Sequence, residues 1–155
     1  MTPPPQRPAY LHANALVLGE FGLLLRGPAG AGKSTLTLKL VADWRARGVF
    51  AALVGDDRVA LEASHGRLIA RPHPSIRGMI EARGLGVLRV DSEPACVVRA
   101  VIDLLALDQS PERFPDADQS RTELSGVILP RIFENAARVG AVTRIGAYIQ
   151  ALATN

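Results

Sequence analysis

The stretch GPAGAGKS, residues 27–34, decides the fold of this chain. It matches the phosphate-loop pattern G-x-x-x-x-G-K-[ST], in which glycines let successive backbone N–H groups point inward at an anion. The chain has 18 Lys and Arg residues, but only Lys33 and Lys39 are lysines. A compact ammonium therefore stands at the position where a phosphate loop needs a point charge. We expect the loop and the threonine after it to bind the phosphates of a nucleotide. The residues are Gly27, Pro28, Ala29, Gly30, Ala31, Gly32, Lys33, Ser34 and Thr35.

The segments on either side of the loop have the periodicity that a phosphate loop requires. Residues 21–26 predict a strand that leads into the loop, and apolar positions at helical spacing predict a helix over about residues 33–47. Alternating side chains predict an earlier strand, Tyr10 to Leu18, joined to the next by a turn at Gly19-Glu20. Antiparallel pairing across that turn sets His12 about opposite Gly27. We therefore expect a histidine beside the phosphate loop.

The remaining pattern predicts an α/β fold: one P-loop domain with a mixed β-sheet, a phosphate-loop helix and a C-terminal helix. Residues 9–155 form this domain, and residues 1–8, which hold four prolines, form a flexible tail. Residues 77–84 are interpreted as a loop, and 108–119 as another. The other predicted elements are strands at 49–54, 59–61, 67–71, 87–90 and 96–105, the last with a helix as the alternative, and a helix over most of 136–154.

Composition excludes several classes of protein. The 155 residues suit one domain, and 48% hydrophobic with 21% charged residues excludes a disordered or fibrous chain. A net charge of +3 without a block of like charge argues against nucleic acid as a partner. The longest nearly apolar run, residues 95–107, is interrupted by Arg99 and Asp103 and is too short to span a membrane. With a single cysteine and no secretory signal, the sequence predicts a cytoplasmic protein.

Three groups of polar residues are candidates for chemistry beside the loop. Asp56 and Asp57 close an apolar strand, where an α/β sheet presents its ligand-binding edge, so one carboxylate could accept a proton and the other support a metal. Glu81 and Arg83 add an acid and a guanidinium that suits phosphate oxygens. The simpler alternatives are an Asp-rich turn, solvated arginines and, for His12, a surface histidine.

As a set, these residues resemble the catalytic domain of the HPr kinase/phosphorylase family. The resemblance covers about residues 9–128 and is carried by His12, the loop GPAGAGKS, the strand end LVGDDRV at 53–59 and the segment IEARGLG at 80–86. It implies a fold like that of HPr kinase and phosphoenolpyruvate carboxykinase, and assembly as a homo-oligomer, a hexamer. The implied activity is the ATP-dependent phosphorylation of a serine on an HPr-type phosphocarrier protein of a bacterial phosphotransferase system, with the reverse phosphorylase reaction open.

The resemblance also implies a role for each matching residue. Asp56 would be the base that takes the proton of the substrate serine, with His12 adjusting its protonation and Lys33 and Arg83 completing the catalytic set. Mg²⁺ would be held by Ser34 and Glu81, with support from Asp57. Arg83 and Arg113 would contact phosphate or the carrier.

Two other functions fit the phosphate loop itself. The first is a small-molecule kinase that phosphorylates a metabolite. The second is a regulatory module that binds ATP without catalysis. Such a sensor needs Lys33 and Ser34 but no base, so Asp56, His12 and Glu81 favour an enzyme.

Overall fold

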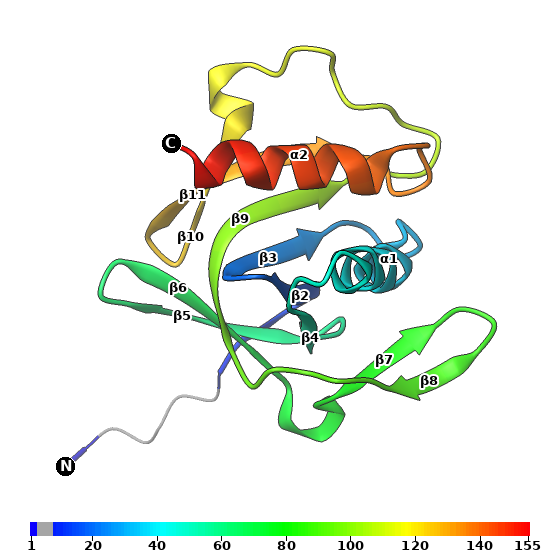
Figure 1. The fold of residues 1–155 in the computed structure, drawn as a ribbon. Coiled ribbons are helices and arrows are strands. Elements are labelled where there is room, and N and C mark those ends of the chain that lie inside the picture. Colours follow the sequence, from blue (N-terminus) through cyan, green and yellow to red (C-terminus); the bar gives the residue numbers. More distant parts are fainter. Residues whose placement is uncertain (3–7) are drawn as a thin grey trace.

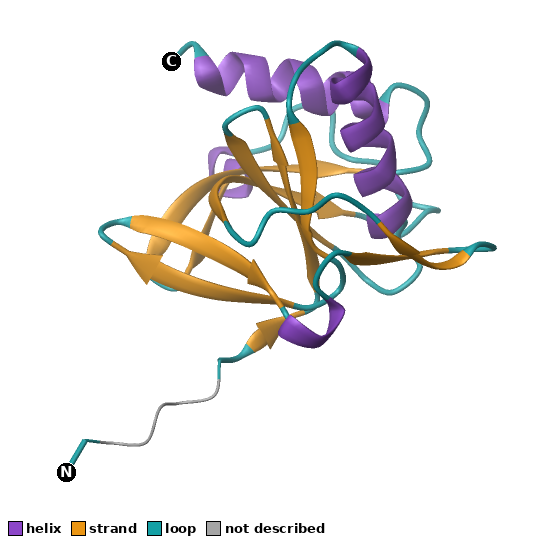
Figure 2. Cartoon of the chain, turned by 60° about the horizontal axis from the view of Figure 1, so that its bottom comes forward, coloured by secondary structure: helices purple, strands orange, loops and turns teal. Residues whose placement is uncertain are grey.

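A curved mixed sheet forms the centre of the computed structural model, which describes residues 1–2 and 8–155 (Figures 1 and 2). The predicted tail, residues 1–8, lies largely outside the described residues. The sheet runs in the order β1-β5-β6-β9-β3-β2-β4, and β11 joins it through β9 and carries β10. Its strands are β1 (Tyr10–Leu11), β2 (Ala13–Leu18), β3 (Phe21–Arg26), β4 (Ala51–Gly55), β5 (Val59–Ser64), β6 (Arg67–Pro72), β9 (Cys96–Leu104), β10 (Arg121–Leu124) and β11 (Val127–Glu134).

The other elements cover the sheet or project from it. These are α1 (Lys33–Ala46), α2 (Ala141–Ala153), two short 3₁₀ helices at Pro74–Ile76 and Ala117–Ser120, and a separate hairpin of β7 (Met79–Ala82) and β8 (Gly86–Arg89). The hairpin extends away from the sheet on the side of α1 (Figure 1). The predicted fold class is therefore confirmed.

Four strands point their carboxyl ends at one edge of the sheet. β3 is parallel to β9, β9 is parallel to β11, and β4 runs in the same direction because both β3 and β4 are antiparallel to β2. The segments that follow these four strands are the phosphate loop, the Asp56-Asp57 turn, the segment after Leu104 and the segment after Glu134. Functional side chains gather at such an edge in open α/β sheets.

The core lies on both faces of the sheet because side chains alternate along each strand. One cluster joins the helices to the sheet and includes Leu23 and Leu25 of β3, Leu40 of α1 and Ile149 of α2. The second cluster takes Leu24 from β3 and lies beneath the β5–β6 hairpin, which contributes Leu68. Successive side chains of β3 thus pack on opposite faces of the sheet, which is why this strand is buried along most of its length.

The structure corrects three of the sequence predictions and confirms the β2–β3 register. Ala13 pairs with Arg26, as predicted, but the strand predicted from Tyr10 to Leu18 breaks at His12, because β1 pairs with β5 whereas β2 pairs with β3 and β4. The C-terminal helix begins only at Ala141, after Gly140 adopts a left-handed φ of 82°. Part of the segment 77–84 is β7 rather than loop.

Strands β10 and β11 have no counterpart in the sequence prediction. Pro130 lies within β11, where a proline argues against a central strand. In the fold, β11 pairs with β10 as far as Pro130 and with β9 from Arg131 onward. The proline therefore lies where the strand changes partners.

Candidate active site

A cleft of about 790 Å³ opens at the sheet edge where the four carboxyl ends meet. It is lined by residues of the phosphate loop and the start of α1, of the Asp56-Asp57 turn and of the β7–β8 hairpin. Its lining residues are Ala29, Gly30, Gly32, Lys33, Ser34, Thr35, Leu36, Lys39, Asp56, Asp57, Glu81, Ala82, Arg83, Gly84, Gly86, Leu107, Ala136 and Ala137. Most of the predicted site residues are thus brought together.

The phosphate loop has the backbone of an anion cradle. Gly30 and Gly32 have φ values of 81° and 90°, which side-chain-bearing residues rarely adopt. A Cβ on Gly27 would lie 2.8 Å from the Leu104 carbonyl oxygen, so the loop also depends on glycine for space. No side chain caps the N-terminus of α1, so its first N–H groups remain available to an anion. This arrangement fits the phosphates of ATP.

Lys33 lies across the loop that it terminates. Its Nζ donates to the carbonyl oxygens of Gly27, at 2.9 Å, and Pro28, at 3.3 Å. These are weaker partners for an ammonium than phosphate oxygens would be. The lysine is therefore already held at the cradle.

Asp56 is a buried carboxylate with two neutral donors. Its side chain follows β4 and the residue is 7% exposed. Oδ1 accepts a hydrogen bond of 2.6 Å from the Ser34 hydroxyl, and Oδ2 accepts one of 2.9 Å from the backbone N–H of Glu81. Within residues 8–155, no Lys, Arg or His forms an ion pair with it. A carboxylate of this kind can accept a proton or bind a metal ion.

His12 approaches Asp57 rather than Asp56. Its Nδ1 lies 3.7 Å from Oδ1 of Asp57, and both side chains are exposed, at 79% and 61%. Asp57 itself has a φ of 59°, a left-handed conformation for a residue with a side chain. The predicted histidine therefore contacts the carboxylate that follows Asp56 in sequence, and it is not among the residues lining the cleft.

The hairpin brings Glu81 and Arg83 to the cleft as exposed side chains. No group of three or more His, Cys, Asp and Glu side chains that could hold a metal occurs within the described part of the chain. Mg²⁺ commonly takes only one or two protein ligands and fills its octahedron with phosphate oxygens and water. The Ser34 hydroxyl with one nearby carboxylate fits that requirement.

Arg113 lies elsewhere. It is not among the residues lining the cleft, but lines a second cavity of about 850 Å³ together with Phe133, Glu134 and Arg138. Its guanidinium lies 5.4 Å from the ring centroid of Phe114. The structure therefore separates this arginine from the other predicted site residues.

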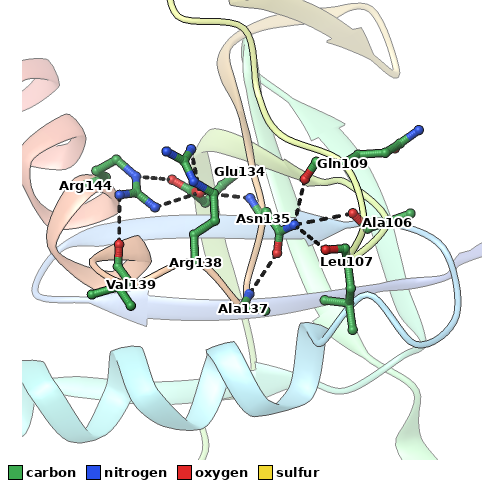
Figure 3. A network of polar contacts seen from close by, with 9 residues as sticks. All are labelled: Ala106, Leu107, Gln109, Glu134, Asn135, Ala137, Arg138, Val139 and Arg144. Carbon is green, nitrogen blue, oxygen red and sulfur yellow. Dashed lines mark hydrogen bonds and ion pairs between the residues drawn. The ribbon is translucent and has the colours of Figure 1, made fainter.

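A polar network beside the second cavity fixes the start of α2 (Figure 3). Glu134 is 2% exposed and accepts hydrogen bonds of 2.7 and 3.0 Å from Arg144, whose pKa is raised by this bond. Asn135 holds the segment after β9 by donating to the carbonyl oxygens of Ala106, Leu107 and Gln109. Charge here is compensated by charge, as expected for a structural network.

Asn14 is a site residue that sequence reasoning left without a role. It lies on β2 at 0% exposure, and its side chain contacts Ser34, Thr37 and the backbone of Asp57. The sequence does hold a signal that could have pointed to Asn14: asparagine is unfavourable in strands, and here it stands inside the apolar strand ANALVL.

Comparison with known proteins agrees with this geometry. The family model described as the HPr Serine kinase C-terminal domain matches residues 6–128, close to the predicted extent of 9–128. The chain belongs to this family. As a member of the HPr serine kinase C-terminal domain family, it carries the phosphate loop, both aspartates and the hairpin within the matched region.

Individual relatives point the same way. The chain is 34% identical over 79 residues to an HPr kinase/phosphorylase of Mycoplasma mycoides, covering 51% of this chain and 23% of the relative. It is 30% identical over 125 residues to one of Neisseria meningitidis, covering 76% of this chain and 37% of the relative. The chain thus spans well under half the length of these curated relatives.

A solved structure matches nearly the whole chain. The HPr(Ser) kinase/phosphatase of Coxiella burnetii superposes with a TM-score of 0.72 at 25% identity, covering 92% of this chain and 95% of that one. Among the described residues, the helices are too short or too polar to cross a lipid bilayer.

Proposed function

We propose that this chain is an ATP-dependent protein serine kinase that phosphorylates an HPr-type phosphocarrier protein of a bacterial phosphotransferase system. The observation that carries the proposal is the Asp56 carboxylate, buried beside the phosphate loop and bonded at 2.6 Å to the Ser34 hydroxyl without a cationic partner. A protein that only senses ATP has no need of such a base. The names of the relatives support a phosphocarrier rather than a metabolite as the acceptor.

The predicted catalytic, phosphate-binding and metal-binding residues of the cleft each have a task in this reaction. The loop amides and Lys33 would hold the terminal phosphates, and Ser34 with Glu81, supported by Asp57, would hold Mg²⁺. When bound, Mg-ATP supplies the transferable phosphoryl group and the charge that neutralises its oxygens. Asp56 takes the proton as the acceptor serine Oγ forms a bond to the γ-phosphorus and the bond to the ADP oxygen breaks. Arg83 stabilises the charge that develops on the transferred oxygens.

His12 and Arg113 do not line the cleft, and their proposed roles are indirect. His12 adjusts the local charge through Asp57, since its ring lies 3.7 Å from that carboxylate. Arg113 lines the second cavity, so its predicted role is a contact with the carrier made outside the cleft.

The direct test is to incubate the purified chain with Mg-ATP and the phosphocarrier proteins of the same cell and to look for phosphoserine by mass spectrometry. We expect one carrier to gain a single phosphate on serine. Lys33→Ala, prepared identically, controls for a contaminating kinase and is expected to give none. Phosphorylation of a metabolite with no carrier modified would favour the small-molecule kinase. ATP binding without transfer would favour the sensor.

Further predictions follow from the family. The names kinase/phosphorylase and kinase/phosphatase support a reverse reaction. In it, inorganic phosphate would attack the phosphoserine phosphorus, the bond to the serine oxygen would break, and serine and pyrophosphate would be released. Incubation of the phosphorylated carrier with inorganic phosphate, with pyrophosphate as the readout, tests this. Hexameric assembly and a cytoplasmic location stay predictions, checked by light scattering and by cell fractionation.

A further inference from the structure

Asn14 is a buried polar side chain next to the cleft for which the proposed reaction gives no task. It lies on β2 at 0% exposure, within a strand otherwise made of Ala, Leu and Val. Burying an amide is unfavourable unless its hydrogen bonds are made, and asparagine is depleted in strands. An apolar residue would suit this position better if packing alone mattered.

The side chain of Asn14 makes hydrogen bonds to two different elements. Nδ2 donates to Thr37 Oγ1 at 3.1 Å and to Ser34 Oγ at 3.4 Å, both on α1. Oδ1 accepts from the backbone N–H of Asp57 at 2.9 Å, in the turn after β4. The orientation of the amide is unambiguous because a backbone N–H can only donate. One side chain therefore connects the phosphate-loop helix to the turn that carries Asp56.

On the side of α1, the contact orients the Ser34 hydroxyl. This hydroxyl donates its proton to Asp56 at 2.6 Å and receives a hydrogen bond from Asn14. A hydroxyl has one proton to donate, so a donor on its other side favours the rotamer in which that proton points at the carboxylate. Ser34 and Asp56 are thus held in one arrangement.

On the side of the turn, the contact holds a strained backbone. Asp57 has a φ of 59°, a left-handed conformation that is uncommon for a residue with a Cβ and is maintained by its surroundings. β4 also shifts its register against β2 between Ala15 and Leu16, beside Asn14. The Asp57 N–H bond to Asn14 anchors the turn directly after this irregularity.

We propose that Asn14 is a positioning residue that sets Asp56 and the Ser34 hydroxyl in register with the phosphate loop. Its effect on phosphoryl transfer rests on the proposed function, whereas its effect on the turn does not. Displacing a reacting group by about 1 Å can lower a rate on the order of 100-fold. Removing Asn14 is therefore expected to lower kcat and to leave ATP binding through the loop largely intact.

Two substitutions distinguish the contact of Asn14 with the turn from its contacts with α1. Asn14→Ala removes all three, whereas Asn14→Asp keeps an acceptor for the Asp57 N–H and loses the donors to Ser34 and Thr37. The matched control is Ile149→Val, a core substitution in α2 far along the chain from the cleft. Each variant is measured for melting temperature, KM for ATP, kcat of carrier phosphorylation and hydrogen exchange of the Asp57 amide.

We expect the Asp57 amide to be protected in the parent protein and in Asn14→Asp and to exchange rapidly in Asn14→Ala. Both Asn14 variants should lose about 10-fold or more in kcat with KM for ATP within about 3-fold, and Ile149→Val should keep both values. The proposal is overturned if the Asp57 amide stays protected in Asn14→Ala, or if both Asn14 variants keep kcat and differ from the parent only in melting temperature. Should the parent phosphorylate no carrier, the proposed function fails, and the exchange of the Asp57 amide still decides whether Asn14 holds the turn.

Discussion

Asp56 and Glu134 are both buried carboxylates at the carboxyl ends of β-strands, directly after β4 and at the last residue of β11, and they differ in what surrounds them. Glu134 is bonded to the Arg144 guanidinium, with Arg138 3.9 Å away, so its charge is compensated inside the protein. Among the described residues, Asp56 accepts hydrogen bonds only from the Ser34 hydroxyl and the backbone N–H of Glu81. The Glu134 carboxylate is already bonded to a guanidinium, whereas the Asp56 carboxylate contacts neutral donors and has room for a cation or a proton from another molecule. The difference is consistent with a structural role for Glu134 and with the catalytic role proposed for Asp56.

The largest effect is expected at Asp56. Asp56→Asn keeps the size of the side chain and removes the base, so phosphoryl transfer should fall about 10²- to 10⁴-fold. Nucleotide affinity, measured by titration with a fluorescent ATP analogue, should survive because the loop and Lys33 are untouched. Transfer at the parent rate would remove Asp56 from the mechanism.

Removing the cationic partner of Glu134, the other buried carboxylate, should affect stability rather than catalysis. Arg144→Ala leaves Glu134 buried with its main cation lost. Because the Arg144 side chain is 39% exposed, we expect a loss of about 2 kcal/mol in the free energy of unfolding, below the value for a fully buried pair. Urea denaturation measures this. Arg138→Ala is the control and should cost about 0.5 kcal/mol, because its contact is longer and more exposed.

Cys96 tests how burial without any partner affects an ionisable group. Burial raises the pKa of its thiol from 9.0 to about 12. The thiol stays neutral in the folded chain while it ionises in the unfolded one, so this stabilising contribution is complete below pH 9 and is lost as the pH rises toward 12. Urea midpoints between pH 8 and 10.5 should fall less in Cys96→Ala than in the parent. At pH 8, a thiol reagent should label the protein only after unfolding.

The smallest effect on stability is expected at His12. Its 3.7 Å contact with Asp57 joins two exposed side chains, so His12→Ala should change the free energy of unfolding by less than about 0.5 kcal/mol. A fall in its transfer rate, measured on protein of unchanged melting temperature, would then report chemistry. A clear loss of stability would show that the contact is structural.

Local sequence signals predicted one part of this molecule well. The phosphate loop, β3 and α1 follow from a motif and from apolar spacing within about 25 residues, and Asp56 follows from its place after an apolar strand. The β2–β3 register was also predictable because a short turn fixes it.

Features that depend on distant pairing were not predicted. The break at His12 arises because β1 pairs with β5, and residues 131–134 of β11 are extended because they pair with β9. Arg113 lies away from the cleft because the long segment after β9 runs toward the second cavity. The contacts of Asn14 join residues 20 to 43 positions apart, and no local pattern encodes them.

The carbonyl oxygens of Gly27 and Pro28 hold the Lys33 ammonium at the phosphate loop within the folded chain itself. A phosphate that binds there would not have to order a free lysine, because it would exchange with these two carbonyl oxygens for an ammonium already in place. The entropy of fixing that long side chain is therefore lost during folding rather than during binding. Nucleotide should accordingly associate without a slow rearrangement of the loop, at a rate set by diffusion into the cleft.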